Sequence, residues 1–217
     1  MQAASHCGLE TPKTYLSENL ETYVVERFDK SSDGTKLGYE DFTTLMKKSN
    51  EPSAKYTSSY ETLLKATYLY TGSTSEVEKM YKYIVFNCLI GNGDAHLKNF
   101  ALQYSADMQN IFVSPPFDIT HTLIYASIDN KMALKLSGSK AFPDLSPLIK
   151  LAESDQFRIR NPKAIIESFS ENILDYLRTS NEVQLFDGLR TSIECSISNI
   201  MAASHVAQSY RDNKNLG

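Results

Sequence analysis

The sequence predicts an α+β fold in which short β-hairpins are attached to a predominantly helical body. The chain has 217 residues, of which 41% are hydrophobic and 22% charged, an ordinary composition for a globular protein. At this length one domain buries roughly 70% of the surface that the unfolded chain exposes, so no disulfide or metal is needed for stability. Two pairs of β-forming segments flank turns, and three long stretches carry apolar residues at helical spacing.

The N-terminal part is predicted to contain short elements. Residues 1–8 match the end of a helix that stops at Gly8, and residues 13–17 and 21–28 alternate around a turn, which predicts a hairpin. Residues 39–48 are predicted to form a short helix, and the polar residues 50–59 a loop.

The clearest helical pattern begins at Ser75. Ser75 and Glu78 have the spacing of a capping box, in which a hydroxyl and a carboxylate satisfy exposed backbone N–H groups. This helix is predicted to end at Gly91, and residues 100–104 and 110–113 follow as a second hairpin. Its apolar stripe comprises Val77, Met80, Tyr81, Ile84, Val85, Cys88 and Leu89.

The last third of the chain is predicted to be helical. Asn161 is a suitable N-cap, with Pro162 at the first helical position, where a missing N–H costs nothing. Two buried faces are expected, made of Ile165, Ile166, Phe169, Ile173 and Leu177 in one helix and of Leu185, Leu189, Ile193, Ile197 and Ile200 in the next.

Charge and cysteine content argue against several classes of protein. Lys and Arg total 22 against 26 Asp and Glu, a net charge of -4, so direct binding of nucleic acid through a basic surface is not expected. Cys7, Cys88 and Cys195 have no zinc-binding spacing, which predicts free thiols in a reducing compartment. No signal peptide and no membrane-spanning apolar stretch is visible, so we expect a cytoplasmic protein without membrane contact.

Residues 90–100 (Ile-Gly-Asn-Gly-Asp-Ala-His-Leu-Lys-Asn-Phe) concentrate polar chemistry directly after the central helix. Taken alone, this stretch is equally consistent with a solvated turn in which Asp94 and Asn99 bond their own backbone. Asp118 changes this balance, because a hairpin between Asn99 and Asp118 would fold that carboxylate back beside the loop. Asp94, Asn99 and Asp118 would then converge as oxygen donors, the set that Mg²⁺ favours and that phosphoryl transfer requires.

The spacing Asp-x-His-x-x-Asn, followed by a later Asp, resembles the catalytic loop and the metal-binding Asp of the protein-kinase-like superfamily. With residues 116–120 (Pro-Phe-Asp-Ile-Thr), residues 90–100 resemble the core of HipA-type bacterial serine/threonine kinases. The resemblance runs from about residue 5 to about residue 180. Further matching segments are the hinge-like residues 25–29 and residues 40–42, 55–56 and 132–134.

This resemblance implies a protein-kinase-like C-terminal lobe that uses ATP and Mg²⁺. Asp94 would be the catalytic base or would orient the acceptor hydroxyl, and Asn99 and Asp118 would hold Mg²⁺. His96 and Lys98 would shape the loop or offset charge on the transferring phosphoryl group. A loop-bracing role for His96 and a solvated surface position for Lys98 remain open alternatives.

The hinge-like segment would supply the contacts to adenine. By the resemblance, backbone groups of Glu26 and Phe28 would meet the base, since a hinge strand offers one C=O and one N–H. Asp29 would lie at the nucleotide as well, although an aspartate at such a position more often caps the following turn than contacts a ribose.

Upstream of the hinge, HipA-type kinases carry a phosphate loop and a strand lysine. Only 25 residues precede Glu26, and the lysine among them, Lys13, lies too close to the hinge. The N-terminal subdomain is therefore expected to be absent. One HipA-like C-terminal kinase domain is expected over 1–217, with a helix end and hinge hairpin over 1–30 and a helical lobe over 31–217.

Three functions are compatible with these expectations. The first is a serine/threonine protein kinase of the toxin–antitoxin kind, with a protein substrate (in the family typically an aminoacyl-tRNA synthetase), an antitoxin partner and an N-terminal partner subunit that completes the nucleotide site. The second is a catalytically silent module that uses the fold to bind an antitoxin or another protein. The third is a small-molecule phosphotransferase of the aminoglycoside-kinase type, which the hinge and residues 98–100 disfavour.

Overall fold

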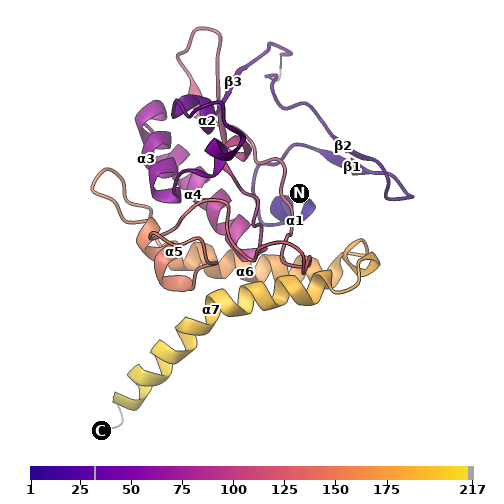
Figure 1. The fold of residues 1–217 in the computed structure, drawn as a ribbon, viewed down its shortest axis with the longest axis vertical. Helices are drawn as coiled ribbons and strands as arrows, with labels where there is room; N and C mark the ends of the chain where they lie inside the picture. The colour runs from indigo at the N-terminus through magenta and orange to yellow at the C-terminus, as the bar shows by residue number, and fades with distance from the viewer. Residues whose placement is uncertain (32, 215–217) are drawn as a thin grey trace.

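A helical body forms most of the molecule, and a thin β-hairpin projects from it (Figure 1). In this computed structural model, residues 1–31 and 33–214 are described. The principal helices are α3 (Tyr60–Thr71), α4 (Thr74–Leu89), α5 (Leu145–Leu151), α6 (Pro162–Thr179) and α7 (Leu189–Lys214). The shorter segments are α1 (Gln2–His6), α2 (Phe42–Leu45) and the 3₁₀ turns η1 (Pro52–Tyr56), η2 (Leu97–Asn99) and η3 (Val183–Leu185).

Helix α4 runs through the centre of the body. It packs against α3, α6, α7 and β5, and nearly every residue from Met80 to Leu89 is buried. The C-terminal half of α4 is thus buried on nearly all sides and is an interior segment. The hydroxyl of Tyr81 donates to the Leu148 carbonyl at 3.0 Å, which ties α4 to α5. The loop that follows α4 therefore starts from a fixed position.

A small antiparallel sheet lies beside that loop. Its strands are β3 (Gly38–Asp41), β4 (Ala101–Tyr104) and β5 (Ile111–Val113), in the order β3-β4-β5. A Cβ at Gly38 would lie 2.0 Å from the ring of Tyr104, its cross-strand partner, so glycine allows this ring to lie against the backbone of β3. Strand β4 is central, which fixes the chain immediately after Asn99.

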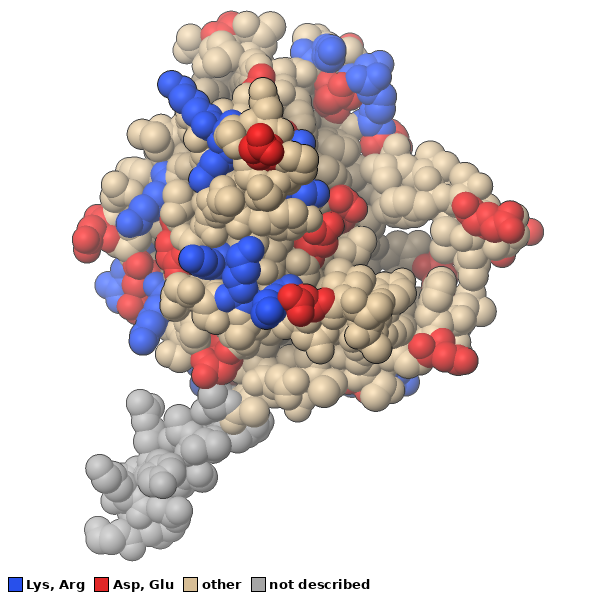
Figure 2. All heavy atoms as spheres, in the orientation of Figure 1, with Lys and Arg blue, Asp and Glu red and all other residues tan. Residues whose placement is uncertain are grey.

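The projecting hairpin consists of β1 (Thr14–Leu16) and β2 (Tyr23–Val25), paired so that Thr14 lies opposite Val25. Tyr15 and Tyr23 on this hairpin are 56% and 54% exposed, which is high for aromatic side chains. A two-stranded hairpin has marginal stability on its own. Figure 2 shows the molecule hollowed between this arm and the body, and it shows basic and acidic side chains intermingled on the visible face.

The predicted α+β class is confirmed, as are both hairpins and the helix end at Gly8, which has a φ of 78°. Helix α6 begins at Pro162 after Asn161, as predicted. Asn161 itself adopts a left-handed conformation and its side chain makes no capping bond. The buried face of α6 includes Ile166, Phe169 and Ile173, in agreement with the predicted stripe.

The predicted start of α4 is wrong by two residues. Ser73, not Ser75, is the N-cap, and its hydroxyl accepts the Glu76 N–H at 3.4 Å. The reason lies in the preceding helix: α3 ends at Gly72 in a left-handed conformation, so α4 begins immediately afterwards. The pairs Ser73–Glu76 and Ser75–Glu78 have the same spacing, so the sequence pattern alone does not distinguish them.

Three other boundaries also differ from the prediction. The range 39–48 begins as strand β3, because it pairs with β4, and Asp41 then caps α2 by accepting the Thr43 N–H at 2.7 Å. The predicted loop 50–59 contains η1. Leu185 is 62% exposed in η3, because the chain turns at Gly188 before α7 begins.

The described residues bear on two predictions, one about membrane-spanning helices and one about the cysteines. Within 1–31 and 33–214, no helix is long and apolar enough to cross a membrane. The cysteines of this part of the chain are free thiols, with Cys7 and Cys88 buried and Cys195 exposed. Burial raises the pKa of both buried thiols to about 12.

Candidate active site

The loop after α4 is held by a buried amide. Gly91 adopts a left-handed φ of 70°, and Asn92 follows it into the interior. The Asn92 side chain donates to Asn87 Oδ1 at 2.7 Å, while its own Oδ1 accepts the Asp94 N–H at 3.0 Å and the Thr120 hydroxyl at 3.2 Å. One side chain thus links α4, the backbone of Asp94 and the segment after Asp118.

Asn99 and Asp118 lie in direct contact. Asn99 Nδ2 donates to Asp118 Oδ2 at 2.6 Å, and Asn99 Oδ1 accepts the His96 N–H at 3.2 Å. Strands β4 and β5 form the hairpin that brings the two residues together. Asp118 has a φ of 53°, a left-handed conformation that is uncommon outside glycine and concentrates at functional sites.

The donor set at this point is one carboxylate and one amide oxygen. The Asn99 amide presents its NH₂ group to Asp118 and its oxygen to the His96 N–H, so to hold a cation together with Asp118 the amide would turn its oxygen toward the carboxylate. Among the described residues, no group of three or more His, Cys, Asp or Glu is placed to hold a metal. The chemistry therefore fits Mg²⁺, which takes few protein oxygens and fills its octahedron with water and phosphate, rather than a zinc-type cage.

Asp94 and His96 are reached by two residues from η1. The Tyr56 hydroxyl donates to Asp94 Oδ1 at 3.1 Å, and Lys55 Nζ lies 2.8 Å from His96 Nε2. Asp94 is exposed, whereas His96 is buried. Burial lowers the pKa of His96, and the positive charge of Lys55 lowers it further against the opposing effect of Asp94.

Lys98 occupies a different environment from its neighbours. It is the last residue but one of η2 and is exposed. The described part of the chain provides no hydrogen-bond or ion-pair partner for its ammonium group. In this arrangement Lys55, not Lys98, is the lysine that contacts the catalytic-loop candidates.

The hinge-like segment is tied to the central sheet. The Phe28 carbonyl accepts Gln103 Nε2 at 2.8 Å, and the Phe28 ring stacks on Phe117 with centroids 5.6 Å apart. The Glu26 N–H donates to the Lys13 carbonyl at 2.8 Å, so it belongs to the hairpin ladder. The groups left for a planar base are therefore the Glu26 C=O and the Phe28 N–H, for which the described residues offer no partner.

Asp29 forms an ion pair with Arg27, whose guanidinium donates to both carboxylate oxygens. These hydrogen bonds lower the pKa of Asp29 to about 2. The Asp29 carbonyl also accepts the Leu37 N–H at 2.9 Å, which closes the turn after the hinge. Any contact of Asp29 with a ribose would compete with Arg27.

The segment after Asp118 is bonded back onto the loop. The Thr122 hydroxyl accepts the Gly93 N–H at 2.8 Å and donates to the Gly91 carbonyl at 3.2 Å. His121 Nδ1 lies 2.5 Å from the Ile90 carbonyl. His121 Nε2 lies 2.8 Å from the Ser192 hydroxyl, which connects the segment to α7. The segment after Asp118 thus connects the loop to the C-terminal helix.

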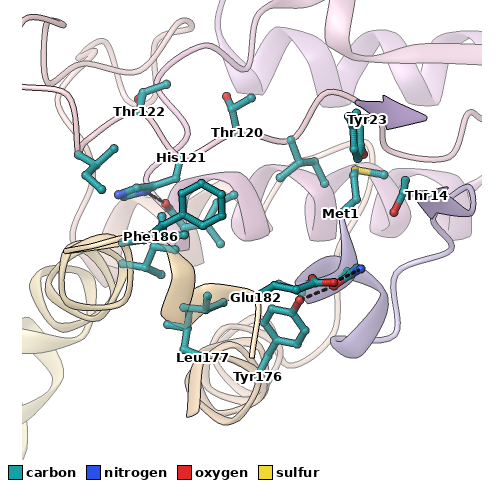
Figure 3. Close-up of a pocket in the computed structure, with 18 of the residues that line it drawn as sticks. Met1, Thr14, Tyr23, Thr120, His121, Thr122, Tyr176, Leu177, Glu182 and Phe186 are labelled. Carbon is teal, nitrogen blue, oxygen red and sulfur yellow. Dashed lines mark hydrogen bonds between the residues drawn. The ribbon is translucent and has the colours of Figure 1, made fainter. Parts of the chain in front are cut away.

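A cavity of about 830 Å³ adjoins this site (Figure 3). Its walls come from α1, the β1–β2 hairpin, residues 119–128 and the η3–α7 region, and they are mostly apolar. Its described lining contains no lysine or arginine, and its acids are Asp94 and Glu182. Tyr23 on this wall is 54% exposed, and its partial burial raises its pKa, with a smaller contribution from the charge of Asp118.

Several residues of the site carry no local signal in the sequence. Residues 55–56 are part of the family resemblance, but no role could be assigned to them, and Gln103 and Thr122 lie in segments without any motif. Their contribution depends on contacts with residues 29 to 75 positions away. The loop is thus visible in the sequence, whereas the roles of the residues that hold it follow only from tertiary contacts.

Comparison with known proteins gives consistent results. The model of a family described as "HipA-like C-terminal domain" matches residues 1–177. Two proteins of Sinorhizobium fredii (strain NBRC 101917 / NGR234) are similar: "Putative kinase Y4dM" is 32% identical over 57% of this chain and 29% of its own length, and "Putative kinase Y4mE" is 29% identical over 63% and 34%. This chain thus spans about a third of the curated relatives it matches.

Two solved structures share the fold. One is the Shewanella oneidensis MR-1 toxin–antitoxin complex of HipA, HipB and operator DNA, with a TM-score of 0.67 and 16% identity over 93% of this chain and 53% of that chain. The other is the Helicobacter pylori proinflammatory kinase CtkA, with a TM-score of 0.61 and 16% identity over 97% of this chain and 85% of that chain. At this identity the match concerns the fold alone.

Proposed function

Because the chain belongs to the family of HipA-like C-terminal domains, a kinase fold, we propose that it transfers the γ-phosphate of ATP to a serine or threonine hydroxyl of a protein. The observation that carries this proposal is the contact between Asn99 and Asp118 at 2.6 Å, beside a loop that presents Asp94 to solvent. An amide and a carboxylate beside an accessible carboxylate are the protein groups that phosphoryl transfer needs.

In the proposed reaction each of these residues has one role. Asp94 accepts the hydrogen bond of the acceptor hydroxyl and orients it. The hydroxyl oxygen attacks the γ-phosphorus, its proton passes to Asp94, and the bond from the γ-phosphorus to the bridging oxygen of ADP breaks. Asn99 and Asp118 would hold Mg²⁺, which neutralises the phosphate oxygens when bound.

The nucleotide would lie between the hinge and these residues. The free Glu26 C=O and Phe28 N–H support contact with adenine, and the stack of Phe28 on Phe117 places the hinge next to Asp118. We place Asp29 near the ribose, where it would exchange its bonds with Arg27. His96 and Lys98 would act on loop shape and on charge near the transferred group.

The phosphate-gripping elements are proposed to come from outside this chain, on an N-terminal partner or segment. Charge-assisted hydrogen bonds of the kind that a phosphate loop supplies contribute roughly 1.5–3 kcal/mol each. Without them, binding of ATP should be weak, so the partner would set the affinity. The proposed protein substrate remains of the class found for the family, an aminoacyl-tRNA synthetase being the first candidate to assay.

The experiment is calorimetric titration with Mg·ATP, on the chain alone and with a candidate N-terminal partner. Asp118→Asn should abolish the Mg²⁺-dependent part of the heat while the protein stays folded, since asparagine also tolerates the left-handed conformation. Asp94→Asn should retain binding and lose phosphate transfer. The exposed Asp155→Asn is the matched control. If the wild type gives no heat in either setting, the proposal is wrong.

A second candidate is a catalytically silent module that binds an antitoxin or another protein. The exposed aromatic side chains of the β1–β2 hairpin favour a protein partner on this arm. An antitoxin is the first partner to test under both candidate functions. If Asp94→Ala leaves the cellular phenotype unchanged while Tyr15→Ser with Tyr23→Ser abolishes it, the silent module is the better description.

A further inference from the structure

Two consecutive residues of η1 reach the catalytic loop from a distant part of the sequence. Tyr56 bonds Asp94, 38 positions away, and Lys55 bonds His96, 41 positions away. Asp94 and His96 are themselves alternate residues of the loop. We propose that Lys55 and Tyr56 form a clamp that positions Asp94 and His96 for phosphoryl transfer, an inference that rests on the proposed kinase function.

The contact of Tyr56 with Asp94 leaves the carboxylate usable. The hydroxyl donates to Oδ1, and the described residues provide no partner for Oδ2. An exposed carboxylate bonded at one oxygen has lost rotational freedom but keeps its second oxygen for the proton of an acceptor hydroxyl. The Tyr56 ring is in turn fixed edge-on against His96, with centroids 5.4 Å apart and an interplanar angle of 78°.

Lys55 sets the state of His96. An ammonium group has only donors, so it assigns Nε2 of His96 as the acceptor and the proton of the neutral ring to Nδ1, a buried atom without a hydrogen-bond partner among the described residues. The Lys55 ammonium also lies 4.9 Å from the centroid of the Tyr56 ring, a distance at which cation and ring attract each other. The three side chains therefore hold one another, and no ion pair with Lys55 occupies the Asp94 carboxylate within the described residues.

The clamp stands on a fixed base. Lys140 Nζ donates to the Tyr56 carbonyl at 3.3 Å, and Lys48 Nζ donates to the Thr57 carbonyl at 2.7 Å. Pro52 begins the turn and restricts its backbone. Supporting residues that are locked by their own partners are what hold a catalytic group to its working geometry. Because they act through Asp94 and His96, Lys55 and Tyr56 are positioning residues.

The test compares four single variants in phosphate transfer with the partner present. Tyr56→Phe and Lys55→Met should lower kcat about 10- to 100-fold, the cost expected for a displaced catalytic group, with the KM for ATP unchanged. Tyr70→Phe, which loses a hydroxyl bond to the Leu45 carbonyl, and Lys163→Met, on the outer face of α6, are the controls.

Two further readouts separate positioning from general destabilisation. Lys55→Arg should restore most of kcat, because a guanidinium can still donate to His96 Nε2. The double variant should lose less than the product of the two single losses, because the residues act on one loop. If Tyr56→Phe and Lys55→Met match their controls in kcat, the clamp proposal is overturned.

An assay that needs no phosphate transfer can test the clamp even if the proposed kinase function is wrong. If the wild type transfers no phosphate, the function proposal fails and amide hydrogen exchange over residues 92–99 decides the clamp. Faster exchange in Tyr56→Phe than in Tyr70→Phe, at equal melting temperatures, supports the clamp. Equal exchange in the two variants overturns it.

Discussion

Replacing Thr122 with valine tests whether the segment after Asp118 is bonded to the catalytic loop. Thr122 is 8% exposed. Its hydroxyl accepts the Gly93 N–H at 2.8 Å and donates to the Gly91 carbonyl at 3.2 Å. Valine has nearly the same shape, so the change removes both hydrogen bonds with little change in packing.

The expected loss can be worked from these two bonds. A neutral hydrogen bond contributes about 0.5–1.5 kcal/mol, and a buried N–H left without a partner costs about 1–3 kcal/mol. We therefore expect Thr122→Val to lower the free energy of unfolding by about 2–3 kcal/mol. For a chain of this size each kcal/mol shifts the melting temperature by about 2–4 °C, which predicts a fall of roughly 4–12 °C.

Thr122→Ser is the matched control, because it keeps the hydroxyl and removes one methyl group at a cost of about 1 kcal/mol. The assay is thermal and urea unfolding of the three proteins, followed by circular dichroism. The expected order of stability is wild type, then serine, then valine. A valine variant as stable as the serine variant would refute the reasoning, since packing and not hydrogen bonding would then hold the segment.

Three further predictions concern other parts of the molecule. Gln103→Leu leaves the Phe28 carbonyl without its donor, so the free energy of unfolding should fall by about 1–3 kcal/mol. The heat of Mg·ATP binding should also become smaller, and a variant with wild-type stability and binding heat would contradict this prediction. Burial lowers the pKa of His121 below its ordinary value of 6.5, because the folded protein favours the neutral ring. The neutral ring therefore stabilises the fold at pH values above 6.5, and this stabilisation is lost as the pH falls through the lowered pKa. His121→Asn, which can still donate to the Ile90 carbonyl, should make the urea midpoint depend less on pH between about pH 7.5 and 5. A variant whose midpoint varies with pH as in the wild type would refute this prediction. Cys195 should react with a thiol reagent in the folded protein and the two buried thiols only after unfolding, which is checked by counting modified thiols.

The chemistry-bearing loop was predictable because its residues are contiguous. Asp94, His96 and Asn99 lie within six positions, and the β4–β5 hairpin, visible from its alternation, is enough to bring Asp118 beside them. The supporting residues were not predictable in the same way. Residues 55–56 match a family segment, but the role of Tyr56 depends on a contact made by the tertiary fold.

The wrongly predicted secondary-structure elements also differ in whether their cause is local or lies in distant contacts. Strand β3 forms because it pairs with β4, a partner about 60 positions away that the local pattern of 39–48 does not reveal. Helix α3 is a different case, because its signals are local: Ser59 caps it and Gly72 ends it. Helix α3 was not predicted, although its buried residues Tyr60, Leu63, Leu64 and Thr67 have helical spacing.

Strand β4 connects the two halves of the proposed nucleotide site. It begins two residues after Asn99, and Gln103 on the same strand holds the Phe28 carbonyl of the hinge. Phe117, the residue before Asp118, also contacts the hinge, because its ring stacks on that of Phe28. The hinge and the metal-ligand candidates are thus fixed to each other through a hydrogen bond and a ring contact. Because this part is already organised within one chain, a partner that grips the phosphates would add its own contacts without having to assemble the site.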